Sequence, residues 1–455
     1  MNKYLYFTIE HKNRELDSKI LLAMEAAKKG YVVIIGTKRL MHLMPKFMFP
    51  KGVYFYKEAM AGRESLFREI QAKGHKVVVH DEEGFVQFNW DNYKTGGYIS
   101  YDTLKYVDKF LCWGNEQFKV LKDIKKENNL NVFVSSTGHP RLDLLKKDVR
   151  AYNKEENKFN KKIILINTKF GVGNYNTGGD NYLVKQFNDD PLMSVENKNL
   201  LKRLADYDVR LLKEYEHLID KLVVCFPNEL IVIRPHPVEN MEFWENRYSK
   251  FDNIFITREK PVGYWLQQAD VVLHTGCPTA IESFLVDTPV IAYKPIHEPE
   301  FDIELPNDVS FKVQTIDECV HKIGEVLDER YDKDIYKRSG QEILSGHLEN
   351  IDQKLSTVSI IDELDNLIEK KHPYGIMTRL WIKSGFKFLD IGLKAKGIIR
   401  KMINSQVYVE EKGMIEGAEV KETVNRFKSA MNDSTEYEIL TIVENVVLIS
   451  AENIQ

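Results

Sequence analysis

Short apolar runs alternate with longer amphipathic stretches between residues 4 and 293. The runs are rich in β-branched and aromatic side chains, as buried parallel strands are, and the longer stretches repeat apolar positions at helical spacing. Two sets of strands are predicted: 4–9, 31–36, 53–56, 76–80, 110–113 and 132–135, then 163–167, 230–233, 254–257, 271–274 and 290–293. Helices are predicted at 14–29, 64–73, 115–128, 199–222, 262–268 and 279–286. The pattern predicts an α/β protein with two doubly wound, Rossmann-like sheets.

The length of 455 residues suits two domains and an appendage. Residues 143–162 are rich in Lys, Asn, Asp and Glu without apolar periodicity, which predicts a linker. We therefore expect one domain at 1–145, a second at 160–371 and a tail at 372–455, with the two domains facing each other across a cleft. Residues 174–190, rich in Gly and Asn, predict a long loop over that cleft.

The amino-acid composition argues against several classes of function. Lys and Arg total 64 against 68 for Asp and Glu, a formal charge of −4, so no global basic field indicates nucleic acid as a partner. The four cysteines, 112, 225, 277 and 319, have no metal-ligand spacing, which favours a reducing compartment and no structural zinc. The first ten residues do not form a signal-peptide core, and no apolar run reaches 18 residues. A cytoplasmic protein is expected.

Two charged motifs follow predicted strands. Asp81-Glu82-Glu83-Gly84 comes after 76–80, and Arg234-Pro235-His236-Pro237 comes after 230–233. Ligands of open α/β sheets bind at the carboxyl ends of strands, so carboxylates on one wall and cations on another predict a group-transfer enzyme. Each motif alone is equally typical of a solvated acidic turn or a rigid proline turn.

Two further turns carry candidate chemistry. The segment His274-Thr275-Gly276-Cys277-Pro278-Thr279 leads from a strand into a helix, where unpaired amides favour a phosphate, and Glu282 is one turn further on to accept from ribose hydroxyls. The alternative is that this segment merely starts a helix. In Gly138-His139-Pro140-Arg141, a second rigid cationic turn at the domain junction, we expect His139 and Arg141 to act at a hinge or in the cleft.

Together these motifs resemble those of GT-B glycosyltransferases that use CMP-activated acid sugars, among them bacterial sialyltransferases with a D/E-D/E-G motif and an HP motif. More closely, residues 80–86, 137–143, 167–176, 231–240 and 273–283 are similar to the bacterial surface carbohydrate biosynthesis family associated with sialic, legionaminic and pseudaminic acid loci. The resemblance spans residues 4–370, and the tail lies outside it.

The resemblance implies an acceptor role for the first domain and a CMP-sugar donor role for the second. The base that deprotonates the acceptor hydroxyl is then one of Asp81, Glu82 or Glu83, because neighbouring like charges raise the pKa of a carboxylate and let it act as a base near neutral pH. We favour Glu82, then Asp81. The donor-site residues expected to bind CMP and stabilise its departing phosphate are Arg234, His236, Pro237, Asn167, Thr168, Lys169, His274, Thr275, Gly276, Cys277, Thr279 and Glu282.

No cofactor is expected beyond the CMP-activated donor. Protein cations can neutralise its single phosphate, so no metal is expected either. Asp189-Asp190 is the nearest approach to a metal-binding acid pair, and its loop position favours a solvated turn.

The tail changes character after Lys371. Residues 372–403 hold seven basic residues against one acid, Asp390, interleaved with aromatic and aliphatic side chains, a pattern typical of helices that lie on an anionic bilayer. The alternative is a helix packed across both domains with its lysines solvated. A chain ending at Lys371 is expected to lose lipid binding in the first case and thermal stability in the second. Residues 404–455 are expected to form a small packing or oligomerisation element; the oligomeric state stays open.

Three functions remain open from the sequence. The leading one is transfer of a nonulosonic acid or Kdo from its CMP donor to a surface glycan or lipid-linked glycan, at the inner face of the cytoplasmic membrane. The second is CDP-glycerol or CDP-ribitol phosphotransfer in teichoic-acid-like synthesis. The third is a non-enzymatic scaffold that binds nucleotide sugars during capsule assembly.

Overall fold

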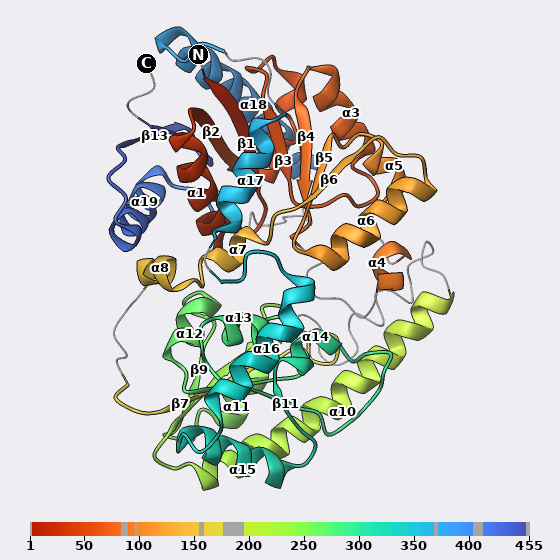
Figure 1. Ribbon diagram of the computed structural model, residues 1–455, viewed down its shortest axis with the longest axis vertical. Helices are drawn as coiled ribbons and strands as arrows, with labels where there is room; N and C mark the ends of the chain where they lie inside the picture. Colours follow the sequence, from red (N-terminus) through yellow and green to blue (C-terminus); the bar gives the residue numbers. More distant parts are fainter. Residues whose placement is uncertain are drawn as a thin grey trace. The chain divides into compact units, whose positions relative to one another are not determined.

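The computed structural model describes residues 2–82, 90–95, 98–153, 159–175, 195–352, 354–367, 372–403 and 413–451. The chain forms two compact units (Figure 1). Unit 1 comprises Met1–Asn153 and Ser345–Gln455, and unit 2 comprises Lys154–Leu344. Each is a layered α/β structure around a mainly parallel sheet, as the alternating sequence pattern predicts.

The parallel part of the unit 1 sheet has the order β2-β1-β3-β4-β5-β6. Its strands match the predicted runs to within one residue at each end, and β2 is buried along its whole length, which accounts for its continuous apolar sequence. The chain direction across the sheet reverses between β1 and β3. The bounds are β1 (Lys3–Ile9), β2 (Tyr31–Thr37), β3 (Val53–Tyr56), β4 (Lys76–His80), β5 (Lys109–Cys112) and β6 (Phe133–Ser136), with helices α1 (Lys12–Lys28), α2 (Lys38–Met41), α3 (Glu64–Ala72) and α6 (Asn115–Glu127).

The end of the chain completes this sheet. A hairpin of β13 (Tyr437–Val443) and β14 (Val446–Ala451) adds to β2 in antiparallel register, with Ile449 opposite Val33. Figure 1 shows these blue elements beside the red N-terminal strands. The hairpin turns at Asn445, which adopts a positive φ of 67°. Residues 413–451 are therefore part of unit 1 and not a separate tail.

Two helices complete the unit 1 core, one before and one after residue 371, where the second domain was expected to end. The core includes Val424 and Phe427 of α19 (Gly417–Met431) as well as Ile360 and Leu364 of α17 (Ser356–Asp365). Unit 2 accordingly ends at Leu344 and not at the expected residue 371. The difference arises because the apolar faces of both helices pack against α1 and its sheet.

Unit 2 contains a six-stranded parallel sheet of order β9-β8-β7-β10-β11-β12. Counted along the chain this is 3-2-1-4-5-6, the order of dinucleotide-binding sheets, with the reversal between β7 and β10. The last strand, β12, is short and partly exposed, and the sequence pattern did not predict it. The strands are β7 (Ile163–Asn167), β8 (Leu230–Arg234), β9 (Ile254–Ile256), β10 (Val271–His274), β11 (Val290–Tyr293) and β12 (Phe311–Val313), and the helices are α10 (Val195–Cys225), α11 (Met241–Tyr248), α12 (Val262–Gln268), α13 (Thr279–Leu285), α14 (Glu304–Asp308), α15 (Ile316–Leu327) and α16 (Lys333–His347).

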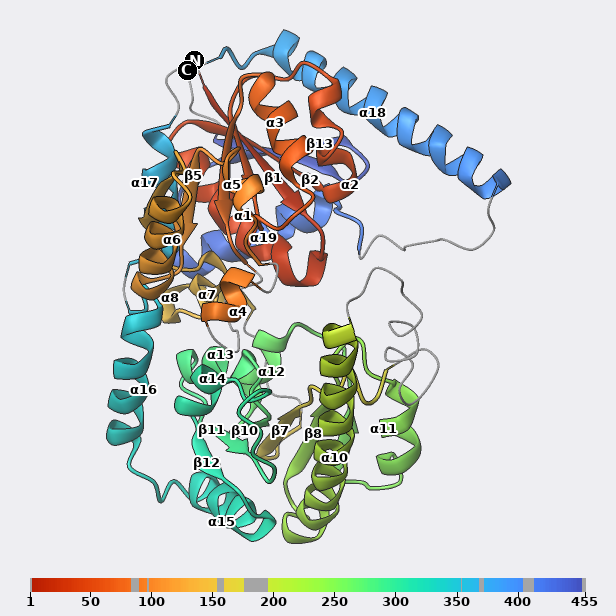
Figure 2. The same ribbon diagram turned by 90° about the vertical axis from the view of Figure 1, so that its right-hand side faces the viewer.

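A long helix, α18 (Ile376–Ile403), runs along the outside of unit 1 (Figure 2). It contacts β13, α2 and the short turn Met44–Lys46. Within the described parts of the chain, no helix is long and apolar enough to span a bilayer.

The packing of α19 predicts that Phe427→Ala lowers the free energy of unfolding by about 3–5 kcal/mol, because a large core side chain leaves a cavity. Phe427 is fully buried and its ring lies 4.3 Å from that of Tyr152. Denaturant unfolding measures the effect, with Met414→Ala, at a half-exposed side chain, as the control. Equal stability of the two variants would show that the C-terminal segment does not belong to the unit 1 core.

Candidate functional site

Unit 2 places polar groups at the sheet reversal between β7 and β10. Asn167 ends β7 and is paired in register with Arg234, which ends β8. Asn167 Nδ2 donates to Thr279 Oγ1 at 3.2 Å, while Asn167 Oδ1 is buried and has no partner among the described residues. The Nε of Arg234 is likewise buried without a partner in the described part of the chain. An unfilled acceptor and an unfilled donor thus lie together at the position where this fold binds ligands.

The charge of Arg234 is balanced by its surroundings. Burial lowers the pKa of its guanidinium, whereas the Glu282 carboxylate of α13 raises it. One guanidinium nitrogen donates to the Lys260 carbonyl at 3.2 Å. Arg234, Glu282, Asn167 and Thr279 are therefore the sequence-predicted donor residues that converge in the structure.

A buried carboxylate fixes the His-Pro turn. The side chain of Glu239 is fully buried and accepts from Thr168 Oγ1 at 2.7 Å, Phe170 N at 3.0 Å and His236 N at 3.1 Å. Its second oxygen accepts from Trp244 Nε1 at 3.1 Å. The loop after β7 and the turn after β8 are thereby held by one group.

Arg258 holds the same turn from the other side. Its guanidinium donates to the carbonyl oxygens of Pro235 at 3.3 Å, His236 at 2.9 Å and Glu239 at 2.5 Å. The imidazole of His236 itself is exposed, with Nδ1 accepting from Val238 N at 3.4 Å. The sequence analysis missed Glu239 and Arg258; an acid three residues after the histidine, directly before a helix, was the available signal for Glu239.

The turn after β10 differs from the phosphate site expected there. His274 is fully buried, and burial lowers its pKa to about 3, so its ring is neutral at neutral pH. Its Nδ1 accepts from Gly276 N at 2.9 Å and Cys277 N at 3.2 Å, while Nε2 donates to Ser310 Oγ at 2.9 Å. These two amides are therefore already satisfied, and α13 has only seven residues. The His274 ring therefore stabilises this turn, and the amides of Gly276 and Cys277 are not available to an anion.

The remaining donor-side residues have distinct surroundings. Thr168 is engaged by Glu239, and Pro237 is exposed beside His236. Thr275 is half-buried. Burial lowers the pKa of the Lys169 ammonium, against the effect of the Cys277 and Asp208 side chains.

In unit 1 the acidic motif lies directly after β4. Glu82 is buried and ion-paired with Lys19 of α1, and Asp81 accepts from Tyr93 Oη at 2.7 Å. Gln117 Nε2 donates in turn to Tyr93 at 2.6 Å. Glu83 lies outside the described residues. Asp81 and Glu82 each contact a specific partner and are buried, so the motif is not a solvated acidic turn.

Lys19 adds an effect that the sequence does not reveal. Burial lowers the pKa of its ammonium to about 7, although the nearby Glu15 carboxylate opposes the shift. An ammonium in contact with Glu82 favours the ionised carboxylate, whereas neighbouring acids favour the protonated one. Glu82 therefore contacts a buried lysine whose own protonation changes near neutral pH.

The reversal between β1 and β3 is lined by further charges. Lys57, directly after β3, contacts Glu10 at 2.8 Å and Glu15 at 3.2 Å, and Lys38 contacts Glu10 at 2.8 Å. Although burial opposes it, these hydrogen bonds lower the pKa of Glu10 to about 2. The sequence analysis did not identify these residues, because single charges after strands are typical of solvated turns.

The turn at Gly138–Arg141 is packed inside unit 1. His80 Nε2 donates to the Gly138 carbonyl at 2.9 Å, and the His80 and His139 rings lie 5.1 Å apart. A Cβ on Gly138, whose φ is +80°, would lie 2.3 Å from Ser356 Oγ. The chain passes between the units after Asn153 and after Leu344, so His139 and Arg141 do not lie at those crossings.

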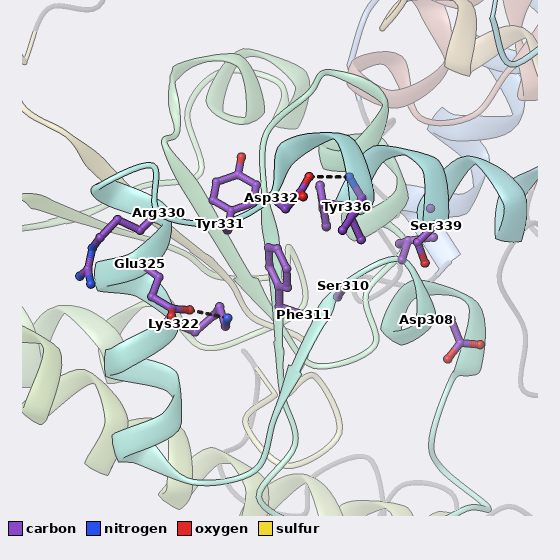
Figure 3. Close-up of a pocket in the computed structure, with 13 residues that line it drawn as sticks. Asp308, Ser310, Phe311, Lys322, Glu325, Arg330, Tyr331, Asp332, Tyr336 and Ser339 are labelled. Atoms are coloured by element: carbon purple, nitrogen blue, oxygen red, sulfur yellow. Dashed lines mark hydrogen bonds and ion pairs between the residues drawn. The ribbon is translucent and has the colours of Figure 1, made fainter.

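A cavity of about 360 Å³ lies elsewhere in unit 2, at the start of β12 between α15 and α16 (Figure 3). Phe311, Tyr331 and Tyr336 line it together with the ion pair of Lys322 and Glu325. It contains none of the residues singled out from the sequence. Among the residues that the structure describes, no group of three or more His, Cys, Asp or Glu side chains is placed to hold a metal ion.

Comparison with known proteins defines the fold class. No protein-family model and no curated protein matches the chain. The solved structure of a putative UDP-N-acetylglucosamine 2-epimerase from Listeria monocytogenes is similar over 83% of this chain and 100% of its own, with a TM-score of 0.53 and 10% identity. S. aureus MnaA, solved with UDP, is similar over 82% of this chain and 100% of its own, with a TM-score of 0.50 and 12% identity.

At such identities the likeness shows the fold alone. The chain has the two-domain α/β fold of the GT-B class, with parallel sheets, and the fold class predicted from the sequence is confirmed.

The hydrogen bonds of Glu239 predict the effect of Glu239→Gln. A glutamine side chain offers one acceptor oxygen, so at least one buried donor loses its partner, which costs about 1–3 kcal/mol of stability. We expect a lower melting temperature and weaker binding of a nucleotide monophosphate. The matched control is Glu242→Gln, at an exposed position of α11. Identical melting and binding for both variants would show that Glu239 does not hold the turn.

Proposed function

We propose that the protein is a glycosyltransferase that moves a nonulosonic acid, or Kdo, from its CMP-activated donor to a bacterial surface glycan. The observation that carries the proposal is the pair of unfilled polar atoms, Asn167 Oδ1 and Arg234 Nε, at the sheet reversal of unit 2. A guanidinium edge suits a phosphate, and an amide oxygen suits a sugar hydroxyl or a base amino group. The motif resemblance supplies the choice of CMP.

In this proposal Arg234 and His236 stabilise the charge that develops on CMP as it leaves. The turn that carries His236 is held by Glu239 and Arg258, so its donors need no rearrangement during the reaction. Glu282 accepts from the ribose hydroxyls, and Lys169 adds positive charge to the donor side. Neutralisation by protein cations requires no metal ion.

The acidic motif of unit 1 supplies the base. Glu82, in contact with Lys19, takes the proton of the acceptor hydroxyl, whose oxygen then bonds to the anomeric carbon as the bond to CMP breaks. Asp81 and Glu83 are the other candidates for this role. The acceptor is a surface glycan or a lipid-linked glycan that meets the enzyme on the cytoplasmic side of the membrane.

A nucleotide panel tests the donor. CMP should raise the melting temperature more than UDP or GDP, because a ligand that binds only the folded state stabilises it. His236→Ala should lower the transfer rate by about 100-fold or more, since a preorganised stabiliser of the leaving group is lost. His217→Ala, at an exposed position on α10, serves as the control.

Other outcomes of the same panel would exclude the proposal. A preference for UDP would point to a UDP-sugar enzyme such as the 2-epimerases that share the fold. Tighter titration by CDP-glycerol than by a CMP-sugar would favour phosphotransfer. Tight CMP binding without release of CMP from any donor and acceptor would favour a scaffold.

The base assignment predicts a separation of binding from turnover. Glu82→Gln and Asp81→Asn should abolish transfer and leave CMP affinity unchanged, because the base acts on the acceptor hydroxyl. Isothermal titration with CMP and a transfer assay measure the two properties. If both variants lose CMP affinity yet transfer normally at saturating donor, the carboxylates serve the donor and not the acceptor.

A further inference from the structure

One face of α18 is packed against unit 1. Ile382 and Phe386 are fully buried and Leu389 is nearly so, and the ring of Phe386 lies 4.6 Å from that of Phe49. Gly385 allows this approach, since a Cβ there would lie 2.5 Å from the Phe47 ring. Arg379 and Glu438 form an ion pair at the N-terminal part of the helix. The orientation of α18 about its own axis is therefore fixed.

The opposite face of α18 is apolar and exposed. Six of the fifteen exposed large hydrophobic side chains in the described part of the molecule belong to this one helix. Five of them lie on one stripe at helical spacing, with exposed fractions between 41% and 79%: Met377, Leu380, Trp381, Phe388 and Ile391. A helix that had only to cover unit 1 would need one apolar stripe, and α18 has two.

Basic side chains flank this exposed stripe. Lys383 and Lys387 are one turn apart along its edge, exposed, and without an ion pair in the described part of the chain. The only acid in the helix, Asp390, contacts Lys394 at 2.9 Å, and Lys394 also contacts Glu444 at 3.2 Å. An apolar stripe beside uncompensated positive charge is complementary to an anionic lipid surface.

A second copy of the chain fits this face less well. In a symmetric dimer with antiparallel copies of α18 the two lysine edges would lie on the same side and repel, and in a parallel arrangement the lysines would lie apart without an anionic partner. A bilayer of anionic lipids offers both acyl chains for the apolar stripe and phosphate groups for the lysines.

We propose that the outer face of α18, formed by these five apolar side chains together with Lys383 and Lys387, docks on an anionic lipid bilayer. The proposal does not depend on the donor or on the reaction. It would bring the chain to the surface where lipid-linked acceptors are found.

Vesicle sedimentation of the full-length protein tests the docking. Wild-type protein should bind vesicles that contain phosphatidylglycerol, bind phosphatidylcholine vesicles weakly, and dissociate at high salt. Lys383→Glu combined with Lys387→Glu should weaken binding by more than about 30-fold, since the loss of each basic residue near such a surface costs about fivefold and each added carboxylate repels the anionic lipid. Trp381→Ser should weaken binding to phosphatidylglycerol vesicles at low salt, where the wild-type protein is bound, because an apolar contact with the acyl chains is lost.

Matched controls separate this face from general charge and from misfolding. Lys119→Glu with Lys126→Glu makes the same charge change on the exposed side of α6 and should leave binding nearly unchanged. Ile335→Ser removes an exposed apolar side chain from unit 2. Melting temperatures should be equal across the variants, because none of the substituted side chains is buried.

Three results would overturn the proposal: wild-type binding that is equal on neutral and anionic vesicles, undiminished binding by the double lysine variant, or a dimer that Trp381→Ser dissociates while no vesicle is bound. Nucleotide binding, which tests the proposed function, is a separate measurement and can fail or succeed independently.

Discussion

The common direction of the strands determines where chemistry is possible in each unit. Parallel strands need crossover helices, which cover both faces of the sheet and leave the loops at the strand ends as the place for polar groups. Where the strand order reverses, the loops on either side lead away in opposite directions. These reversals lie between β1 and β3 and between β7 and β10. Glu10 and Lys57 lie at the first reversal, and Asn167 and His274 lie at the second.

The two reversals differ in how their charges are balanced. In unit 1 the buried lysines near the strand ends have partners in contact: Lys19 with Glu82, and Lys57 with Glu10 and Glu15. In unit 2 the atoms Asn167 Oδ1 and Arg234 Nε remain unfilled among the described residues. A buried polar group without a partner costs about 1–3 kcal/mol, and a ligand that fills it recovers that cost. This contrast favours donor binding in unit 2, whereas the carboxylates of Glu10, Glu15 and Glu82 in unit 1 are held by lysines.

The sequence predicts the central parallel strands well because they are buried on both faces, so each is a continuous apolar run bounded by polar turns. The edge strand β12, which is short and partly exposed, is not predicted. The sequence also does not predict the C-terminal hairpin as part of the first sheet, because the pairing of Ile449 with Val33 joins residues far apart in the chain. The sequence does not predict the burial of Lys19 for a related reason. A lysine in an amphipathic helix is normally solvated, and only the packing of α1 buries it beside Glu82.

In the candidate donor site, the sequence predicts the residues but not which of their atoms are available to a ligand. The residue types at the strand ends are visible in the sequence, and Asn167, Arg234 and Glu282 are indeed brought together. Which atoms stay available depends on side-chain orientation. The ring of His274 turns back onto the amides of Gly276 and Cys277, whereas Glu239 turns inward to hold the His-Pro turn. Both orientations also depend on partners from distant parts of the chain, Ser310 for His274 and the Thr168–Phe170 loop for Glu239, which the local sequence does not reveal.

For residues 372–403 the sequence left two alternatives open, a helix packed across both domains and a helix on a lipid surface. One side of α18 is packed on unit 1, and the proposed lipid surface would contact the other side. A helix of 28 residues makes several turns, so residues three and four apart can form a buried stripe through Phe386 and, on the far side, an exposed stripe through Trp381 and Phe388. Deletion of the tail would remove both stripes together with two strands and α19, and unfolding of unit 1 would then obscure any effect on lipid binding. The outward side chains contribute little to the fold, so their apolar and basic character is best explained by a surface that they contact outside it.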